Sequence, residues 1–242
     1  MRLLFLTLLA ALSLLAQPLA ITSDDRFELK GEITLPKGEG PFPLVVMAHQ
    51  FGADRHLWDP VVPTLLEMGC AVLAMDLRGH GESVMQNGKE NRIPPGHDFA
   101  KANEKVDFSA IPGDLSLWLE TVTDRFPVDG EKIILVGSSL GAISVLALLA
   151  DAEPAAVIVL SPGNPAAVGK ENVELALRTY TGPILYVAAK EDPLGSGKRI
   201  LEYPLYNQKQ IRLVTGGNLH GFVLFPRIES LFYGMIREIV QE

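Results

Sequence analysis

The feature that most constrains the fold of this chain is the segment GSSLG at residues 137–141. An apolar, β-like run at residues 132–136 precedes it, and an apolar, helix-like run at residues 142–150 follows it. A Gly-x-Ser-x-Gly pattern in this setting is typical of a sharp strand-to-helix turn, whose central serine has a strained backbone and whose glycines allow close packing. The pattern alone is weak support, because it also occurs by chance. Its position between a β-like and a helix-like run is what favours the strand-to-helix turn.

Ser139, at the centre of this pattern, is the candidate nucleophile. The helix that follows it directs its first N–H groups and the positive end of its dipole toward the same turn. Negative charge that develops on a substrate oxygen would be stabilised there, and Leu140 N–H is one expected donor. Ser138 is expected to matter little for the chemistry.

The positions of the histidines select a partner for Ser139. In a serine hydrolase with this kind of turn, an acid and then a histidine follow the nucleophile along the chain. The five histidines are His49, His56, His80, His97 and His220. Only His220 follows Ser139, in a glycine-rich loop after a β-like run, so it is the expected base. The alternative is a surface-loop histidine with no role.

Position also selects the acid among the carboxylates between Ser139 and His220. These are Asp151, Glu153, Glu171, Glu174, Glu191, Asp192 and Glu202. Residues 184–189 have the apolar pattern of a buried parallel strand, and functional groups collect where such strands end. Asp192, in the following loop, is expected to accept a hydrogen bond from His220 and to orient it. Glu191 is the alternative, because an error of one residue in register would exchange the two.

Two further segments carry a family resemblance, namely HQFG at residues 49–52, after an apolar strand-like run, and DLRGHGES at residues 76–83. With the 137–141 turn, they make the chain similar to the α/β-hydrolase superfamily, in its serine esterase, dienelactone-hydrolase-like or serine-aminopeptidase-like branches. The resemblance covers roughly residues 49–222. It implies that Phe51 N–H is the second oxyanion donor. Gln50 stands where many members have glycine, which leaves Gln50 as the alternative donor.

The DLRGHGES segment is interpreted as structural. Its carboxylate and guanidinium suit an ion pair, and its glycines suit a tight reversal of the chain. Nothing in the expected chemistry needs His80.

Strand-like and helix-like runs alternate over most of the chain. The expected strands lie near residues 44–48, 71–75, 132–136, 156–160, 184–188 and 210–214, and the expected helices near 57–68, 115–125, 141–150, 172–180, 197–203 and 226–241. This alternation predicts the α/β class, with a doubly wound, mostly parallel sheet and helices on both faces. Residues 27–35 are expected to add an antiparallel edge strand or hairpin.

Two connections bear on access to the site. Residues 161–182 leave room for one helix only, which predicts no large cap domain and an open site. Residues 82–113 form the longest stretch without clear periodicity, and such stretches are either functional lids or solvated excursions. His97 lies there and is expected to be an exposed loop histidine rather than a second base.

The first twenty residues have one positive charge, then an apolar run, and then small residues, as in a secretory signal peptide. Cleavage is expected after Ala20, which leaves residues 21–242 as a single domain and predicts a secreted or periplasmic protein. An uncleaved N-terminal anchor is the alternative, because the apolar run is nearly long enough to span a bilayer.

Charge and composition limit the partners. The net charge of −8 argues against nucleic acid and anionic membranes as partners. Cys70 is the only cysteine, which excludes an internal disulfide. No metal-binding or nucleotide-binding motif is present, so neither a metal nor a cofactor is expected.

The expected partner is therefore a small-molecule ester or acyl substrate. The leading function is a serine hydrolase that cleaves a carboxylic ester through an acyl-enzyme intermediate. The alternatives are a peptidase, thioesterase or acyltransferase with the same triad, or a non-catalytic binding protein with this fold. The oligomeric state is not predicted.

Overall fold

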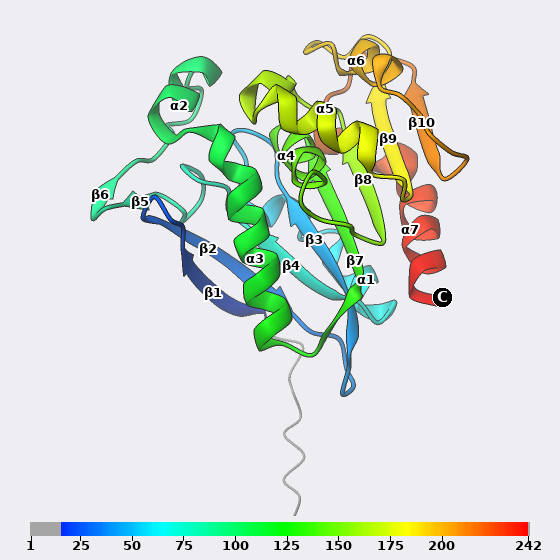
Figure 1. Cartoon of the computed structure of the whole chain (residues 1–242), viewed down its shortest axis with the longest axis horizontal. Helices are drawn as coiled ribbons and strands as arrows, with labels where there is room; N and C mark the ends of the chain where they lie inside the picture. The colour runs from blue at the N-terminus through cyan, green and yellow to red at the C-terminus, as the bar shows by residue number, and fades with distance from the viewer. Residues whose placement is uncertain (1–15, 242) are drawn as a thin grey trace, which may run out of the picture.

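Six parallel strands form the centre of the structure, a computed structural model that describes residues 16–241 (Figure 1). Along the sheet they are ordered β10-β9-β8-β7-β3-β4. Their bounds are β3 Phe42–Ala48, β4 Ala71–Met75, β7 Val128–Ser138, β8 Ala156–Leu160, β9 Ile184–Ala189 and β10 Gln210–Thr215. Each lies within two residues of a predicted run or extends it, so the prediction of a mostly parallel α/β sheet is confirmed.

Antiparallel strands extend the sheet beyond β4. Strand β2 (Phe27–Thr34) pairs with β4, and strand β1 (Gln17–Thr22) and the two-residue β5 (Met85–Gln86) both pair with β2. A last short strand, β6 (Lys89–Glu90), pairs with β5. The predicted antiparallel strand is therefore half of a β1–β2 hairpin, and it lies inside the sheet rather than at its edge.

Helices cover both faces of the sheet (Figure 1). Helices α3 (Ile111–Arg125), α4 (Leu140–Leu148), α5 (Lys170–Thr179) and α6 (Ser196–Glu202) share one apolar core with the sheet, and α1 (Val62–Glu67) and α7 (Phe225–Gln241) share the other. Every residue of α4 is buried. This helix follows the GSSLG segment, so the segment lies at the centre of the fold.

The predicted leader, residues 1–20, overlaps the described part of the chain in β1. Residues 1–15 lie outside the described residues. Residues 17–20 of the predicted leader belong to a strand that pairs with β2 over its whole length, and the Leu19 side chain is buried in the core. Cleavage after Ala20 would remove Gln17–Ala20 from this strand. The leader itself stays a prediction.

Two expectations about local structure need correction. The helix expected at residues 57–68 is broken into a 3₁₀ helix at Arg55–Trp58 and α1, because Pro60 lacks an N–H and disfavours a helical residue before it. Residues 82–113 are more regular than expected. They contain the β5–β6 hairpin and helix α2 (Phe99–Val106), whose N-terminus is capped by the side chain of Asp98.

The connection between β8 and β9 is short. It contains a 3₁₀ turn at Pro165–Ala167 and helix α5, and no large cap domain is present there, as predicted. Within residues 16–241, none of the helices has both the length and the apolar content needed to cross a membrane.

Candidate active site

Ser139 occupies a strained turn between β7 and α4. Its backbone has φ 50° and ψ −104°, a combination that residues other than glycine rarely adopt. The two glycines of the segment have no room for a side chain. A Cβ on Gly137 would lie 2.6 Å from backbone atoms of Ala142, and a Cβ on Gly141 would lie 2.2 Å from the carbonyl oxygen of Ala48. The sequence pattern thus matches a close contact of strand, turn and helix.

The structure brings together Ser139, His220 and Asp192, which the sequence predicted as a triad. His220 Nε2 lies 2.8 Å from Ser139 Oγ, and His220 Nδ1 lies 2.8 Å from Asp192 Oδ2. The Asp192 carboxylate is buried and also accepts a hydrogen bond from Leu194 N–H at 2.8 Å. This arrangement can transfer a proton from the hydroxyl to the imidazole while the carboxylate holds the imidazole in place.

Glu191, the alternative acid, does not contact His220. Its side chain accepts a hydrogen bond from Gly217 N–H at 3.0 Å, and its own N–H donates to the carbonyl of Gly217 at the same distance. Glu191 therefore links the loop after β9 to the loop that carries His220. Glu191 thus has a structural contact between two loops, and Asp192 is the acid in contact with the imidazole.

The two predicted oxyanion donors lie on neighbouring segments. Gly141 N–H donates to the carbonyl of His49 at 3.1 Å, which joins the start of α4 to the loop that contains Phe51. Leu140 is the first residue of α4, so its N–H has no partner within the helix. The backbone hydrogen bonds of the described residues also leave Phe51 N–H without a partner. Both N–H groups are therefore available to a substrate oxygen.

Aromatic packing fixes the position of Phe51. Its ring makes edge contacts with His80 at 5.4 Å and Phe99 at 5.1 Å between centroids, and a further one with Phe108 at 6.0 Å. Phe99 and Phe108 come from residues 82–113, the stretch expected to be aperiodic. This stretch therefore packs against the predicted oxyanion loop. The sequence left two roles open for this stretch, a lid and a solvated excursion, and the packing on Phe51 tests neither.

The predicted chemistry does not use His49, the first residue of the predicted oxyanion loop, or His80, which packs against Phe51, and both are buried. His49 Nδ1 donates to the carbonyl of Gln50 at 2.8 Å, and its Nε2 accepts from Leu77 N–H at 2.9 Å. Burial lowers the pKa of His49 to about 3, and the neighbouring His80 adds to this effect. Burial also lowers the pKa of His80. Both imidazoles are thus neutral near pH 7 and serve as structural groups.

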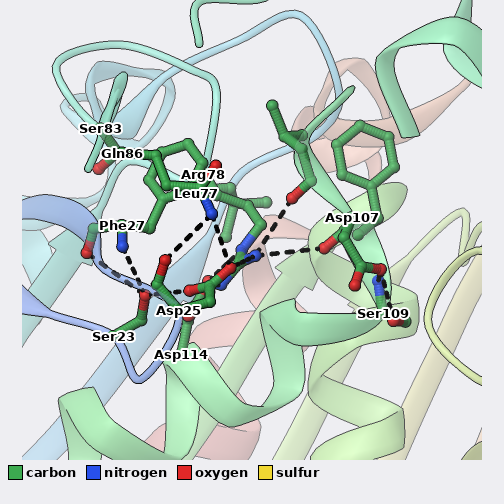
Figure 2. A network of polar contacts seen from close by, with 12 residues as sticks. Ser23, Asp25, Phe27, Leu77, Arg78, Ser83, Gln86, Asp107, Ser109 and Asp114 are labelled. Carbon is green, nitrogen blue, oxygen red and sulfur yellow. Dashed lines mark hydrogen bonds and ion pairs between the residues drawn. The ribbon is translucent and has the colours of Figure 1, made fainter. Parts of the chain in front are cut away.

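Arg78 is the centre of a second polar cluster (Figure 2), called here the Arg78 cluster: Arg78 with Asp25, Asp114 and the Val106 carbonyl. Its guanidinium donates to both oxygens of Asp114, at 2.7 and 2.8 Å, and to Asp25 Oδ2 at 2.9 Å. It also donates to the carbonyl of Val106 at 3.1 Å. Burial disfavours the charge, but the two carboxylates raise the pKa of Arg78 above its usual value.

The 76–83 segment is structural, as its sequence suggested, but its carboxylate and guanidinium do not pair with each other. Asp76 and Arg78 each form an ion pair, but with other residues: Asp76 pairs with Arg55 and accepts hydrogen bonds from the N–H groups of Arg55 and Glu82, both at 2.8 Å. Gly81 has φ 50°, and a Cβ there would lie 2.3 Å from the Asp76 carboxylate. The glycine is required because the carboxylate fills that space.

Two further groups of possible ligands lie outside the triad. Glu32, His56 and Asp59 offer ligand atoms within 4.8 Å of one another, but His56 and Asp59 are exposed and paired with each other. The Cys70 thiol is buried, and burial raises its pKa to about 11, so it is an unreactive core group.

The side chain of Gln50 also belongs to the site and was not among the residues predicted from the sequence. Its Oε1 accepts hydrogen bonds from Ser138 Oγ and from Phe222 N–H. The departure from glycine at this position was the available signal, although it was interpreted only in terms of the backbone. Ser138, expected to matter little, is fully buried and takes part in this contact.

Comparisons with known proteins agree with this fold. The chain matches the alpha/beta hydrolase family over residues 45–225. Among solved structures, it is similar to a cold-adapted esterase from an Arctic intertidal metagenomic library, with a TM-score of 0.70, 20% identity and 93% of each chain covered. It is also similar to the Pyrococcus furiosus esterase Pf2001 (TM-score 0.63, 17% identity, 94% of this chain and 92% of that one).

An acetyl xylan esterase from Paenibacillus sp. R4 shares the fold as well, with a TM-score of 0.65, 17% identity, and 93% of this chain and 89% of that chain covered. The comparison with curated proteins gives no match. A serine on a sharp strand-to-helix turn in a mostly parallel sheet is typical of the α/β-hydrolase fold. This chain belongs to the alpha/beta hydrolase family.

Proposed function

We propose that this hydrolase is a serine esterase that cleaves a carboxylic ester through an acyl-enzyme intermediate. The observation that carries the proposal is the continuous chain of contacts from Ser139 Oγ through His220 to the Asp192 carboxylate, with 2.8 Å at each step. The esterases among the structural neighbours add support from the fold.

In the proposed acylation step, Ser139 Oγ attacks the carbonyl carbon of the ester and its proton passes to His220 Nε2. The negative charge then moves to the carbonyl oxygen, where the N–H groups of Phe51 and Leu140 stabilise it. When the tetrahedral intermediate collapses, the C–O bond to the alcohol breaks and His220 returns the proton to the leaving oxygen. Asp192 stabilises the imidazolium throughout.

Deacylation repeats the sequence with water. His220 takes a proton from the water as its oxygen attacks the acyl carbon, and it gives that proton to Ser139 Oγ as the acid leaves. Ser139 itself is buried, but His220, which takes the proton from the water, keeps 18% of its side chain exposed. The short connection between β8 and β9 leaves no large cap over the strand ends.

The test is hydrolysis of p-nitrophenyl esters of graded acyl length, compared between the wild type and Ser139→Ala. The proposal expects turnover of at least one ester and its loss in the variant. Matched anilides and thioesters distinguish peptide and thioester cleavage from ester cleavage. Turnover that persists in Ser139→Ala would contradict the proposal. Faster cleavage of amides or thioesters than of esters would show that the substrate is a peptide or a thioester instead.

We further propose that the chain acts outside the cytoplasm, on the basis of the leader-like sequence at residues 1–20. The position of β1 suggests a cleavage point before Gln17, because later cleavage would remove residues that pair with β2. N-terminal sequencing of the exported protein tests this. A start at Met1 would favour the uncleaved anchor instead.

A further inference from the structure

Gln50 joins three segments of the candidate site through one atom. Its Oε1 accepts a hydrogen bond from Ser138 Oγ at 2.9 Å and another from Phe222 N–H at 3.0 Å. Gln50 itself lies in the loop after β3, directly before Phe51. Ser138 precedes the candidate nucleophile, and Phe222 lies two residues after His220. The oxyanion loop (residues 49–52), the nucleophile turn (residues 137–141) and the histidine loop (residues 216–222) therefore meet at this amide.

We propose that Gln50 is a positioning residue for the triad, which holds the histidine loop and the nucleophile turn in register with the oxyanion loop. The proposal rests on the proposed serine-hydrolase function. A carbonyl oxygen suits this place because it has two lone pairs and can accept both hydrogen bonds at once. Glycine at this position would leave the Ser138 hydroxyl and Phe222 N–H without this acceptor, which is costly where water is excluded.

The packing around this amide is tight. Gly221, between His220 and Phe222, has φ +67°, and a Cβ there would lie 2.2 Å from Gln50 Oε1 and 2.9 Å from Ser138 Oγ. The histidine loop therefore has a glycine where it passes the amide. Ser138 is fully buried, so its hydroxyl has no access to water as a substitute partner.

The consequence for catalysis follows from distance. The proposed reaction needs His220 Nε2 within hydrogen-bond reach of Ser139 Oγ, and these atoms are now 2.8 Å apart. Among the described residues, the Gly141 N–H to His49 carbonyl bond also ties the nucleophile turn to the oxyanion loop, but the histidine loop is hydrogen-bonded to that loop only through Gln50 Oε1. A misplacement of about 1 Å at a catalytic site can cost roughly 10²-fold in rate. Loss of this acceptor should therefore lower kcat more than it raises KM.

The experiment compares two variants of Gln50 with a matched control. Gln50→Met keeps the length of the side chain and removes the acceptor, whereas Gln50→Glu keeps an acceptor oxygen. Gln210→Met is the control, because Gln210 is also buried and its amide also joins segments, accepting from Tyr206 N–H at 2.9 Å and donating to the Tyr180 carbonyl at 3.1 Å, outside the triad. All are compared by kcat and KM for one ester, by the rate of fluorophosphonate labelling, and by thermal unfolding.

The expected result is a loss of roughly 10- to 100-fold in kcat and in labelling rate for Gln50→Met with KM within about threefold, and recovery of most of that loss in Gln50→Glu. Gln210→Met should lower the Tm and leave kcat unchanged. Equal kcat in Gln50→Met and the wild type would overturn the proposal, as would a failure of Gln50→Glu to recover activity while it remains folded.

A double substitution gives a second readout that does not depend on the size of the single effect. If Ser138 acts through Gln50, Ser138→Ala should cost a few-fold in kcat/KM in the wild type and nothing further in Gln50→Met. Additive costs would contradict the proposed contact. A wild-type protein that neither hydrolyses esters nor reacts with the phosphonate would overturn the proposed function and this proposal together, whereas an active wild type with an equally active Gln50→Met would overturn this proposal alone.

Discussion

The Arg78 cluster and the triad are both largely buried polar assemblies, and they differ in how completely their groups are paired. Arg78 is 1% exposed, and its guanidinium donates to two carboxylates and a carbonyl. Ser139 is 7% exposed, its hydroxyl contacts His220 alone among the described side chains, and the neighbouring N–H groups of Leu140 and Phe51 have no backbone partner. One cluster is saturated, and the other leaves donors free.

This difference separates stability from reactivity. A saturated buried ion pair resists change, because removing one partner leaves the other charged and buried. An assembly with free donors and a strained nucleophile can instead bind the charge that a reaction creates. Substitutions in the triad should therefore change rates and spare the fold, whereas substitutions in the Arg78 cluster should change stability and spare the rates of the folded molecules.

The largest effect is expected for Ser139→Ala. Ester hydrolysis should fall by roughly 10³- to 10⁶-fold, because the members of a triad act as a unit. The free energy of unfolding, measured in urea, should stay the same or rise, because alanine removes no buried partner other than the His220 contact. Ser138→Ala is the matched control and should cost only a few-fold. The opposite ranking of the two serines would contradict the assignment of the nucleophile.

Asp192→Asn should reduce kcat by roughly 10⁴-fold, because the amide no longer holds the reactive tautomer of the histidine. Glu191→Gln serves as the neighbouring control. Its hydrogen bond to Gly217 N–H can persist through the amide oxygen, so only a few-fold loss is expected. Steady-state kinetics of both variants measure this. A larger loss in Glu191→Gln would transfer the acid to Glu191.

Asp114→Ala tests the other side of the comparison. It leaves the Arg78 guanidinium buried without its bidentate partner, which should lower the free energy of unfolding by about 3–5 kcal/mol. Per folded molecule, kcat should match the wild type. Asp25→Ala should cost less, because the Asp25 side chain is 43% exposed and water replaces part of the contact. Denaturant titration and active-site titration measure the two quantities. A loss of kcat in folded Asp114→Ala would show that the Arg78 cluster affects catalysis, and it would contradict the separation of the two assemblies.

A smaller effect is expected from pH. Folding lowers the pKa of His49 to about 3, so below pH 6.5 the unfolded chain binds a proton that the folded chain excludes. Stability should therefore fall as pH decreases, by roughly 2 kcal/mol from this residue between pH 6.5 and 5. His80 acts in the same direction. Denaturant titrations across this range should show a shallower pH slope of the free energy of unfolding in His49→Asn than in the wild type. If His49→Asn had the same pH slope of stability as the wild type, burial of a neutral His49 would not be a source of that slope.

Much of this arrangement could be predicted from the sequence, because local patterns carry it. The apolar runs predicted the parallel strands within a few residues. The order along the chain selected His220 as the partner of Ser139, and the end of a buried strand selected Asp192 as the acid, with Glu191 as the alternative. The loop after β9 was identified because it leaves a buried strand. Its choice between Glu191 and Asp192 needed side-chain geometry, which a pattern of apolar residues does not contain.

The rest depends on contacts between distant segments. Arg78 pairs with Asp114 and Asp25, which lie 36 and 53 residues away in the chain. No local sequence pattern predicts those partners, and Asp76, the carboxylate nearest to Arg78 in the sequence, forms its ion pair with Arg55. The packing of residues 82–113 on Phe51 was hidden for the same reason. Gln50 was visible only as a departure from glycine, and its partners lie 88 and 172 residues further along.

The central claim is that Ser139 is the nucleophile of a working triad. The most direct measurement is mass spectrometry of the intact protein and its peptides after reaction with a fluorophosphonate, in the wild type, His220→Ala and Asp114→Ala. The account predicts one adduct per chain on Ser139, with fluoride displaced, strongly slowed in His220→Ala and unchanged in folded Asp114→Ala. An active wild type with no adduct on Ser139, or with its adduct on another residue, would contradict it.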